Sequence, residues 1–344
     1  MTSATRTTRA PTVISGRRVA LVFVLAAAGL LLAGVIGLTV GTRLIGLGTV
    51  VDAVLRFDGD ALQLVVRESR IPRTVIGIVV GLALGAAGAV MQGLTRNALA
   101  DPGILGVNAG ASVAVAIAVA ALGLSSFPVL MAFALLGALI ATAIVVLLSA
   151  AAGDGSPVTL VLAGVALAAV LGGATTALVL LNPTAFLHMR SWESGALAGR
   201  DLSILAVAGP LIAVGLVLAL LLTRSLDVLA LGDDTAASLG VPMRLVRAGA
   251  VVVVTLLAGT ATAVAGPIAF LGLAVPHIAR GLVGASQKAI VPLSALLGAI
   301  VIVLGDVVGR LVIAPQEVPV GIVMAFVAAP FMVWIGRRRS LTQL

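Results

Sequence analysis

Three arginines recur at every third position in the stretch RESRIPR, at Arg67, Arg70 and Arg73, just before a long uncharged segment. A guanidinium group at the edge of an apolar segment must be paired or hydrated, because an unpaired buried charge is strongly unfavourable. The spacing therefore raises the question of which group these arginines face.

Groups that could perform catalysis or proton transfer are scarce. Asp306, in the stretch LGDVVGR, is the acid placed deepest in an apolar segment, where it could relay protons. The alternative that we favour is an ion pair with Arg310, which follows one helical turn later. His188 and His277 lie far apart, without an HExxH pattern or a nearby carboxylate cluster, so we expect no metal site. The phosphate-binding loop GxxxxGK[ST] is absent, which excludes the usual way of binding ATP.

The composition indicates a membrane protein that crosses the bilayer many times. Of 344 residues, 61% are hydrophobic and 10% are charged, and the mean hydropathy is +1.26. Soluble domains carry about 25% charged residues. The net charge of +8 fits positively charged cytoplasmic loops, and with 3% aromatic residues it does not indicate nucleic-acid binding. Because cysteine is absent, disulfides and thiolate metal sites are excluded.

Charges and helix breakers divide the chain into ten predicted spans, so both termini are expected on one side of the membrane, the cytoplasm. Two uncharged stretches are too long for one span each, and Ser125–Pro128 and Gly266–Pro267 predict the breaks within them. Residues 1–17 are interpreted as a basic tail. The predicted spans cover residues 19–41, 72–95, 104–122, 129–152, 158–181, 202–223, 246–265, 269–284, 290–309 and 318–336.

Small residues and broken helices suggest how the spans are organised. Gly77, Gly81, Gly85 and Gly88 recur near helical spacing, which predicts close packing of one helix on its neighbours. The stretches PGILGV (102–107) and PIAFLGL (267–273) each follow a break and open a short span, five spans apart. This arrangement is typical of an inverted repeat.

Two segments between spans carry polar residues that could serve function. In LGDDTAASLGVP, Asp233 is a suitable N-cap, Gly240 a suitable terminator and Pro242 a stop, which predicts a short helix over 234–239 outside the membrane. The helix lacks the basic face of a membrane-surface helix, so we expect it to contact a protein partner. In the segment 91–112, Asp101 and Pro102 cap the next helix, and the cluster of Gln92, Asn97 and Asn108 around a span end stays unexplained.

These segments resemble the signatures of the FecCD permeases, the membrane subunits of ATP-driven importers for iron-siderophores, haem and cobalamin. The resemblance covers nearly the whole chain. It rests on four ordered motifs, which are RIPRT…GLALGAAGAVMQGLTRNALADPGILGVNAGA (70–111), LGDDTAASLGVP (231–242), AGPIAFLGLAVPHIARGLVG (265–284) and GDVVGRLVIAPQEVPVGIV (305–323).

The resemblance implies an all-α fold of ten transmembrane helices with an inverted repeat, the type II importer permease fold. It implies a dimer, homo- or heterodimer, with a central path. It also implies two cytoplasmic ATPase subunits and an extracytoplasmic substrate-binding protein as partners. No cofactor, no enzymatic activity and no nucleic-acid partner are expected. One permease domain over 18–338 is expected, with a coupling loop at 224–246 and a cytoplasmic tail at 339–344.

Site roles follow from the same resemblance. Arg70, Arg73 and Arg310 match arginines that receive acidic residues of the binding protein. The predicted helix would couple to the ATPase through Gly232, Asp233, Asp234, Ala236, Leu239 and Gly240. Residues expected along the path or gate are Gln92, Asn97, Asn108 and His277, and for His277 a structural hydrogen bond within the broken span 269–284 is the favoured alternative. This chain departs from the family in two places, where Ala98 replaces a common proline and ASQK (285–288) replaces a common Asp-His-Arg.

The function that this pattern favours is import of ferric siderophores through a bacterial inner-membrane permease. Import of haem or cobalamin is the alternative within the family. A proton-driven carrier and a membrane-embedded enzyme are alternatives from other classes. Transport by the importer depends on ATP, whereas transport by a proton-driven carrier does not.

Overall fold

The computed structural model describes residues 15–152 and 157–337, and within these residues it contains helices but no strands. Most of the predicted basic tail, residues 1–14, and the predicted tail 339–344 lie outside the described residues. The all-helical architecture agrees with the composition, because a bilayer accepts only segments whose backbone groups are paired internally.

The helices follow one another without intervening strands in the described residues. In chain order they are α1 (Gly16–Thr39), α2 (Leu47–Leu55), α3 (Ala61–Val65), the π-helix η1 (Val66–Arg70), α4 (Ile71–Thr95), the 3₁₀ helix η2 (Pro102–Leu105), α5 (Val107–Ala120), α6 (Phe127–Ala151), α7 (Pro157–Leu181), α8 (Pro183–Glu193), the 3₁₀ helix η3 (Leu202–Ile204), α9 (Leu205–Leu229), α10 (Asp233–Ser238), α11 (Met243–Ala265), α12 (Leu271–Val283), α13 (Gln287–Val312) and α14 (Val320–Arg337).

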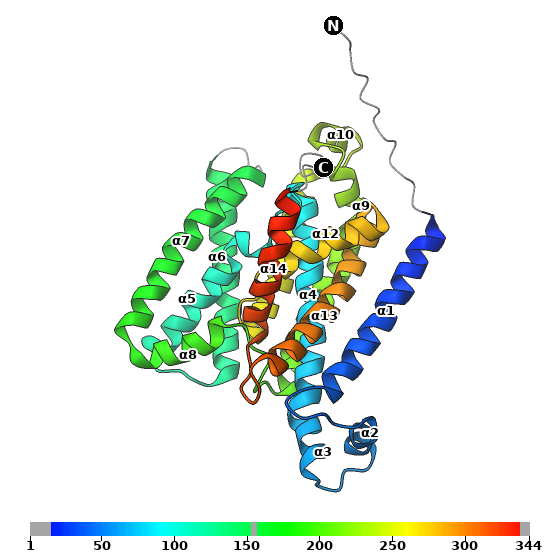
Figure 1. Ribbon diagram of the computed structural model, residues 1–344. Helices are drawn as coiled ribbons and strands as arrows, with labels where there is room; N and C mark the ends of the chain where they lie inside the picture. The colour runs from blue at the N-terminus through cyan, green and yellow to red at the C-terminus, as the bar shows by residue number, and fades with distance from the viewer. Residues whose placement is uncertain (1–14, 153–156, 338–344) are drawn as a thin grey trace.

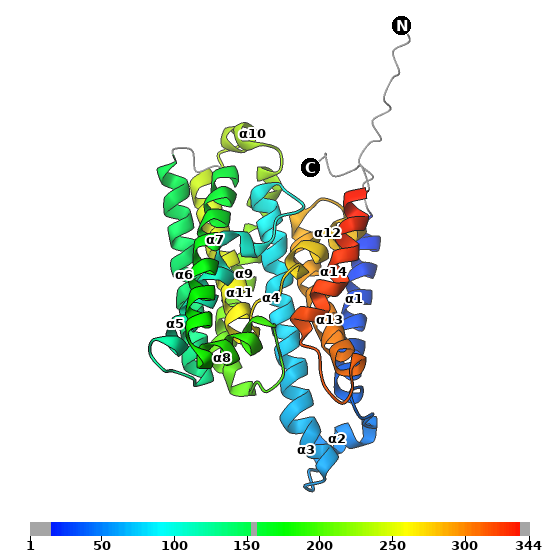
Figure 2. The same ribbon diagram turned by 60° about the vertical axis from the view of Figure 1, so that its left-hand side comes forward.

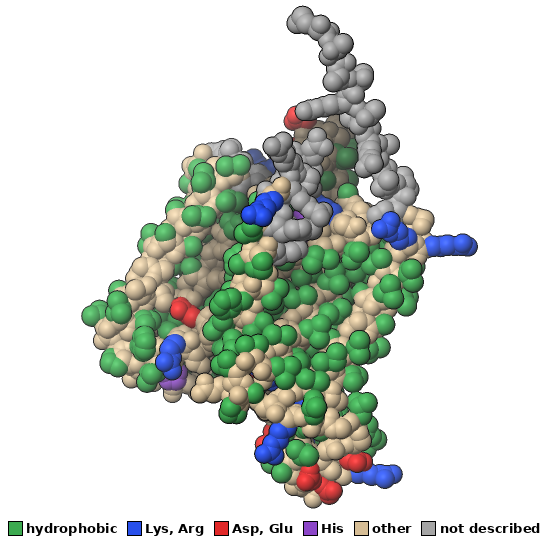
Figure 3. Space-filling view, viewed as in Figure 1, with side chains coloured by type: hydrophobic (Ala, Val, Ile, Leu, Met, Phe, Trp, Pro, Cys, Tyr) green, Lys and Arg blue, Asp and Glu red, His purple; other side chains and the backbone are tan. Residues whose placement is uncertain are grey.

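Seven helical segments of the described chain are long and apolar enough to cross a membrane: α1, α3 with α4, α6, α7, η3 with α9, α11 and α13. Shorter apolar helices lie at α5, α12 and α14. Every predicted span therefore contains a helix, while the count of ten crossings stays a prediction. On the face seen in Figure 3, hydrophobic side chains cover most of the middle of the bundle and charged side chains gather mainly near its ends.

The predicted helix breaks are confirmed. Helix α5 ends at Ala120 and α6 begins at Phe127, and the stretch between α11 and α12 contains Gly266 and Pro267. Asp101 caps η2 as expected, because its carboxylate accepts a hydrogen bond from the backbone N–H of Gly103. The predicted coupling loop 224–246 contains the end of α9, all of α10 and the start of α11.

Helix α4 runs through the centre of the bundle and contacts α9, α11, α12 and α13 (Figure 1). In its apolar window 78% of the residues are buried, against 11% for α1 and for α7, which lie at the periphery. The start of α1, helix α10 and the end of α14 lie at one end of the bundle, and α2 and α3 project from the other end (Figure 2). This arrangement is the one expected if both termini face the same side of a membrane.

Glycines set the distance between α4 and its neighbours. A Cβ atom added at Gly85 would lie 2.1 Å from the carbonyl oxygen of Ser294 on α13, and one at Gly88 would lie 2.0 Å from that of Gly272 on α12. At Gly81 the nearest backbone atoms of α13 would be 2.5 Å away. The predicted close packing is confirmed at these three glycines, because their neighbours are backbone atoms that cannot rotate away.

The glycine packing gives a first testable prediction. Gly85→Ala is expected to cost about 1–3 kcal/mol, since a methyl group forced into a packed contact displaces the backbone. The melting temperature of the purified protein in detergent should fall measurably. Gly34→Ala in α1 is the matched control, because a Cβ atom there meets nothing within 4 Å. Equal melting temperatures for the two variants would contradict the packing argument.

Candidate functional site

A buried charge cluster lies where α4 and α13 meet at the end of the bundle that carries α2 and α3. The Nε and Nη2 atoms of Arg73 donate to one oxygen of Asp306 at 3.0 and 2.9 Å, and Nη1 donates to Glu317 at 2.6 Å. The second oxygen of Asp306 lies 3.3 Å from Nε of Arg310, which confirms the ion pair predicted between these residues. The side chains of Asp306 and Arg73 are only 4% and 7% exposed.

Two arginines of this cluster also bind the end of α1. Both terminal nitrogens of Arg310 donate to the carbonyl oxygen of Gly37 at 3.1 Å, and Arg70 donates to the carbonyl oxygens of Leu38, at 2.9 Å, and of Arg43. The last carbonyls of a helix have no partner within the helix, and positive charge is favourable there. Arg310 therefore satisfies the end of α1 while Asp306 holds it, and Arg70 binds there through backbone carbonyls.

The structure shows internal contacts at all three predicted docking residues. Arg70, Arg73 and Arg310 are 5%, 6% and 4% exposed and already bound inside the protein. Such pairing is needed, because an uncompensated charge in this interior would be strongly destabilising. Their role in docking stays a prediction that must account for these internal contacts.

At the opposite end, α10 forms the short helix that the sequence predicts, one residue earlier than expected. Gly240 terminates it with φ of +75°, as predicted. The prediction that Asp233 caps the helix is wrong: Gly232 occupies the N-cap, and no side chain caps the helix. The Asp233 carboxylate instead forms two ion pairs. Its oxygens lie 2.8 Å from Nη2 of Arg247 on α11 and 3.5 Å from Nη2 of Arg96, which follows α4.

The two faces of α10 differ in exposure. Ala236 is fully buried against the bundle, while Asp234 and Leu239 face outward, with Leu239 61% exposed. An exposed leucine at the tip of a short helix offers an apolar contact to another protein. The ion pairs of Asp233 meanwhile connect this helix to α4 and α11.

The polar residues predicted for the path do not form one cluster. Gln92 is buried. Its amide nitrogen donates to the carbonyl of Leu273 at 3.0 Å, and its amide oxygen accepts from Nη2 of Arg280 at 3.4 Å. Asn97 is exposed and accepts from the N–H of Leu99, so it stabilises the turn after α4.

The other two lie on different helices. Asn108 accepts from the hydroxyl of Thr262 at 2.9 Å, which joins α5 to α11. His277 is half-buried on α12 and takes part in at least one contact within the chain. The path role of Gln92, Asn97, Asn108 and His277 stays a prediction.

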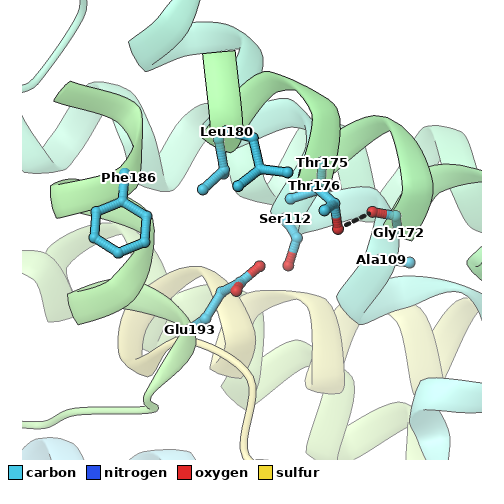
Figure 4. A pocket seen from close by; sticks show the side chains of 9 residues that line it. Ala109, Ser112, Gly172, Thr175, Thr176, Leu180, Phe186 and Glu193 are labelled. Atoms are coloured by element: carbon cyan, nitrogen blue, oxygen red, sulfur yellow. Dashed lines mark hydrogen bonds between the residues drawn. The ribbon is translucent and has the colours of Figure 1, made fainter. Parts of the chain in front are cut away.

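A cavity of about 300 Å³ lies between α5, α7 and α8, which no motif of the sequence indicates. The carboxylate of Glu193 points toward the same space as Ser112 and the threonines of α7, and Phe186 and Leu180 lie on the other side (Figure 4). Partial burial raises the pKa of the Glu193 carboxyl, and a hydrogen bond with Ser112 opposes that shift. The residues that line it are Ala109, Ser112, Gly172, Thr175, Thr176, Val179, Leu180, Phe186 and Glu193.

Comparison with known proteins confirms the resemblance to the FecCD permeases along almost the whole chain. Residues 29–338 match the model of the FecCD transport family. The chain is 43% identical over 312 residues to the ferric enterobactin transport system permease protein of Escherichia coli strain K12, covering 90% of this chain and 93% of that protein. It is 41% identical over 282 residues to the Fe(3+)-citrate import system permease protein of Bacillus subtilis strain 168, covering 82% and 84%.

A solved structure agrees with these relatives in fold. A metal-chelate type ABC transporter in an inward-facing conformation superimposes with a TM-score of 0.80 at 26% identity, covering 93% of this chain and 99% of that one. The predicted permease fold is therefore confirmed.

The charge cluster gives a second prediction. Asp306→Ala is expected to destabilise the protein by about 3–5 kcal/mol, because it leaves Arg73 and Arg310 buried without the acid that they share. Thermal unfolding in detergent measures the effect. Glu68→Ala, which removes an exposed acid on the neighbouring π-helix, should change stability little. Equal losses in both variants would show that Asp306 does not hold the cluster together.

Proposed function

This chain belongs to the FecCD transport family, and we propose that it is the membrane subunit of an ATP-driven importer of ferric siderophores in the bacterial cytoplasmic membrane. The observation that carries the proposal is the match to an iron-chelate permease over nine-tenths of the chain, combined with the superimposed permease fold. Both relatives named above are permeases for ferric chelates, enterobactin and citrate, which supports this substrate class.

In this proposal the chain moves its cargo without catalysing a reaction. Two ATPase subunits bind and hydrolyse ATP in the cytoplasm, and a binding protein delivers the chelate from outside. Residues 18–338 form one permease domain. The end of its bundle that carries α10, the start of α1 and the end of α14 faces the cytoplasm. Its coupling loop, 224–246, then faces the ATPase.

Helix α10 is proposed to transmit the motion of the ATPase. Its outward residues, Leu239 and Asp234, contact the ATPase, and its inward side is fixed by Ala236 and Asp233. Because Asp233 binds Arg96 and Arg247, displacement of α10 pulls on the end of α4 and on the start of α11. Gly232 and Gly240, both with positive φ, permit the sharp turns at either end of the helix.

A second permease subunit is proposed to pack beside α7. This helix is largely exposed in one copy and carries Gly173, Ala174 and Ala177 on its surface, small residues that allow helices to approach closely within a membrane. The path then runs between the two copies. Gln92, Asn97, Asn108 and His277 remain proposed as path or gate residues.

The arginine cluster is proposed to receive acidic groups of the binding protein by exchange of partners. Glu317, whose side chain is 34% exposed, occupies the outer side of Arg73. A carboxylate of the binding protein can replace Glu317 without unpairing Asp306, so docking does not require the cluster to break. This arrangement reconciles burial of the arginines with a docking role.

Reconstitution tests the function. We expect proteoliposomes that contain this chain, its ATPase subunits and its binding protein to take up radiolabelled ferric siderophore only with ATP, and the chain alone to hydrolyse none. Leu239→Asp should lower uptake by about tenfold or more, because a charge buried at the ATPase contact costs well over the 1.4 kcal/mol that a factor of ten requires. Uptake that persists without ATP would instead indicate a secondary carrier.

The control for this variant is Leu44→Asp, the same substitution at a 79% exposed leucine on the other end of the bundle. It should leave association with the ATPase subunits unchanged, as measured by copurification. If both variants copurify and transport equally, α10 is not the coupling element.

Docking is tested with Glu317→Gln. Because glutamine removes the charge that competes for Arg73 and keeps only a neutral acceptor, the affinity for the binding protein should rise by up to about fivefold, in keeping with 0.2–1 kcal/mol for an exposed ion pair. The gain should shrink as salt is added. Titration calorimetry measures it, with Glu68→Gln as the control for a general loss of negative charge. Weaker binding by Glu317→Gln would contradict the exchange of partners.

A further inference from the structure

The cavity between α5, α7 and α8 presents hydrogen-bond acceptors but few donors. The hydroxyl of Thr175 donates to the carbonyl of Leu171 and that of Thr176 to the carbonyl of Gly172, each at 2.9 Å. A carbonyl cannot donate, so the single hydroxyl hydrogen of each threonine is used within α7, and its lone pairs remain. Ser112 lies beside the carboxylate of Glu193 (Figure 4), and a carboxylate accepts but does not donate when ionised.

The charge of the cavity has one sign. Glu193 supplies a negative charge, and none of the lining residues is a lysine, arginine or histidine. Arg190, one turn earlier on α8, is exposed and does not line the cavity. The space therefore favours cationic groups and groups that donate hydrogen bonds, and it disfavours anions.

The position and size of the cavity connect it with transport. The cavity opens beside α7, which shares with α1 the lowest burial among the candidate spanning helices. At the cavity, a glycine and two threonine hydroxyls of α7 replace the aliphatic surface that lipid would favour. Its volume of about 300 Å³ is at the lower limit for ligand sites, so it holds one part of a metal chelate rather than the whole. Phe186 and Leu180 add an apolar wall opposite the carboxylate (Figure 4).

We propose that this cavity is a charge-selecting half-site on the transport route, with Glu193 as its specificity-determining residue. It favours ferric chelates that are neutral or cationic and expose hydroxyl, amide N–H or ammonium groups, and it opposes polyanionic chelates. This inference rests on the proposed function.

The chemistry of siderophores makes the distinction sharp. A hydroxamate binds iron as a monoanion, so a chelate with hydroxamate groups is neutral, or cationic if it carries an ammonium group. A catechol binds as a dianion, so a chelate built from catechols is strongly anionic. The half-site thus assigns the hydroxamate class as the preferred cargo.

The absence of cysteine from this chain allows a direct measurement of the local charge. Thr176→Cys places a single thiol in the cavity of the full-length chain in nanodiscs. We expect it to react faster with a cationic than with an anionic methanethiosulfonate reagent. Because one charge at short range changes each rate by about fivefold even in water, Glu193→Gln should lower the ratio of the two rates by about tenfold or more.

Two controls accompany this measurement. Glu193→Asp should keep most of the ratio, and Glu68→Gln, at an exposed acid distant in the fold, should keep all of it. A ratio that is the same with Glu193 and with Glu193→Gln overturns the proposal, and so does a thiol that neither reagent reaches.

Transport supplies the second readout. In the reconstituted system, Glu193→Gln should reduce uptake of a cationic hydroxamate chelate and raise uptake of an anionic catecholate chelate, relative to the unmodified chain. Opposite or absent changes overturn the half-site. If the unmodified complex takes up no ferric chelate, the proposed function fails, while the ratio of labelling rates still decides whether the cavity selects by charge.

Discussion

The direct contact of backbones between α4 and helices α12 and α13 is the constraint on which the rest of the structure depends. Within a bilayer, helices gain little from the hydrophobic effect, so close packing of small residues must hold them together. Gly81, Gly85 and Gly88 provide that packing along one side of α4. The helix is thereby fixed at the centre of the bundle, and its two ends are placed at opposite ends of the molecule.

What lies at those ends is charged. The first turn of α4 carries Arg73, which binds Asp306 and Glu317, and the residue after its last turn is Arg96, which faces Asp233 of α10. A helix of 25 residues is about 37 Å long. One rigid element therefore joins the proposed docking side to the proposed coupling side, and the contacts at each end involve ion pairs that can be exchanged rather than a continuous apolar core.

Much of this architecture could be predicted because it rests on local signals. Helix breaks at Gly266–Pro267, the left-handed residue Gly240 and the pair of Asp306 with Arg310 all depend on residues within a few positions of one another. The pairing of Arg73 with Asp306 joins residues 233 positions apart, and no local pattern encodes it. For the same reason the internal partners of these arginines could not be predicted. Glu193 was missed because a lone acid at the end of a helix between two spans gives no sign that it lines a cavity until α5 and α7 are placed beside α8.

The arginines that close the end of α1 also order events in time. Arg310 binds the carbonyl of Gly37 across 273 residues of sequence. Synthesis proceeds from the N-terminus, so α1 enters the membrane long before α13 exists, and the carbonyl of Gly37 must rely on water until then, while Arg70 can already bind that of Leu38. Since α1 is otherwise little buried, the bond from Arg310 is a late step of assembly. A chain truncated before α13 would lack this bond and the packing of α1 against α13.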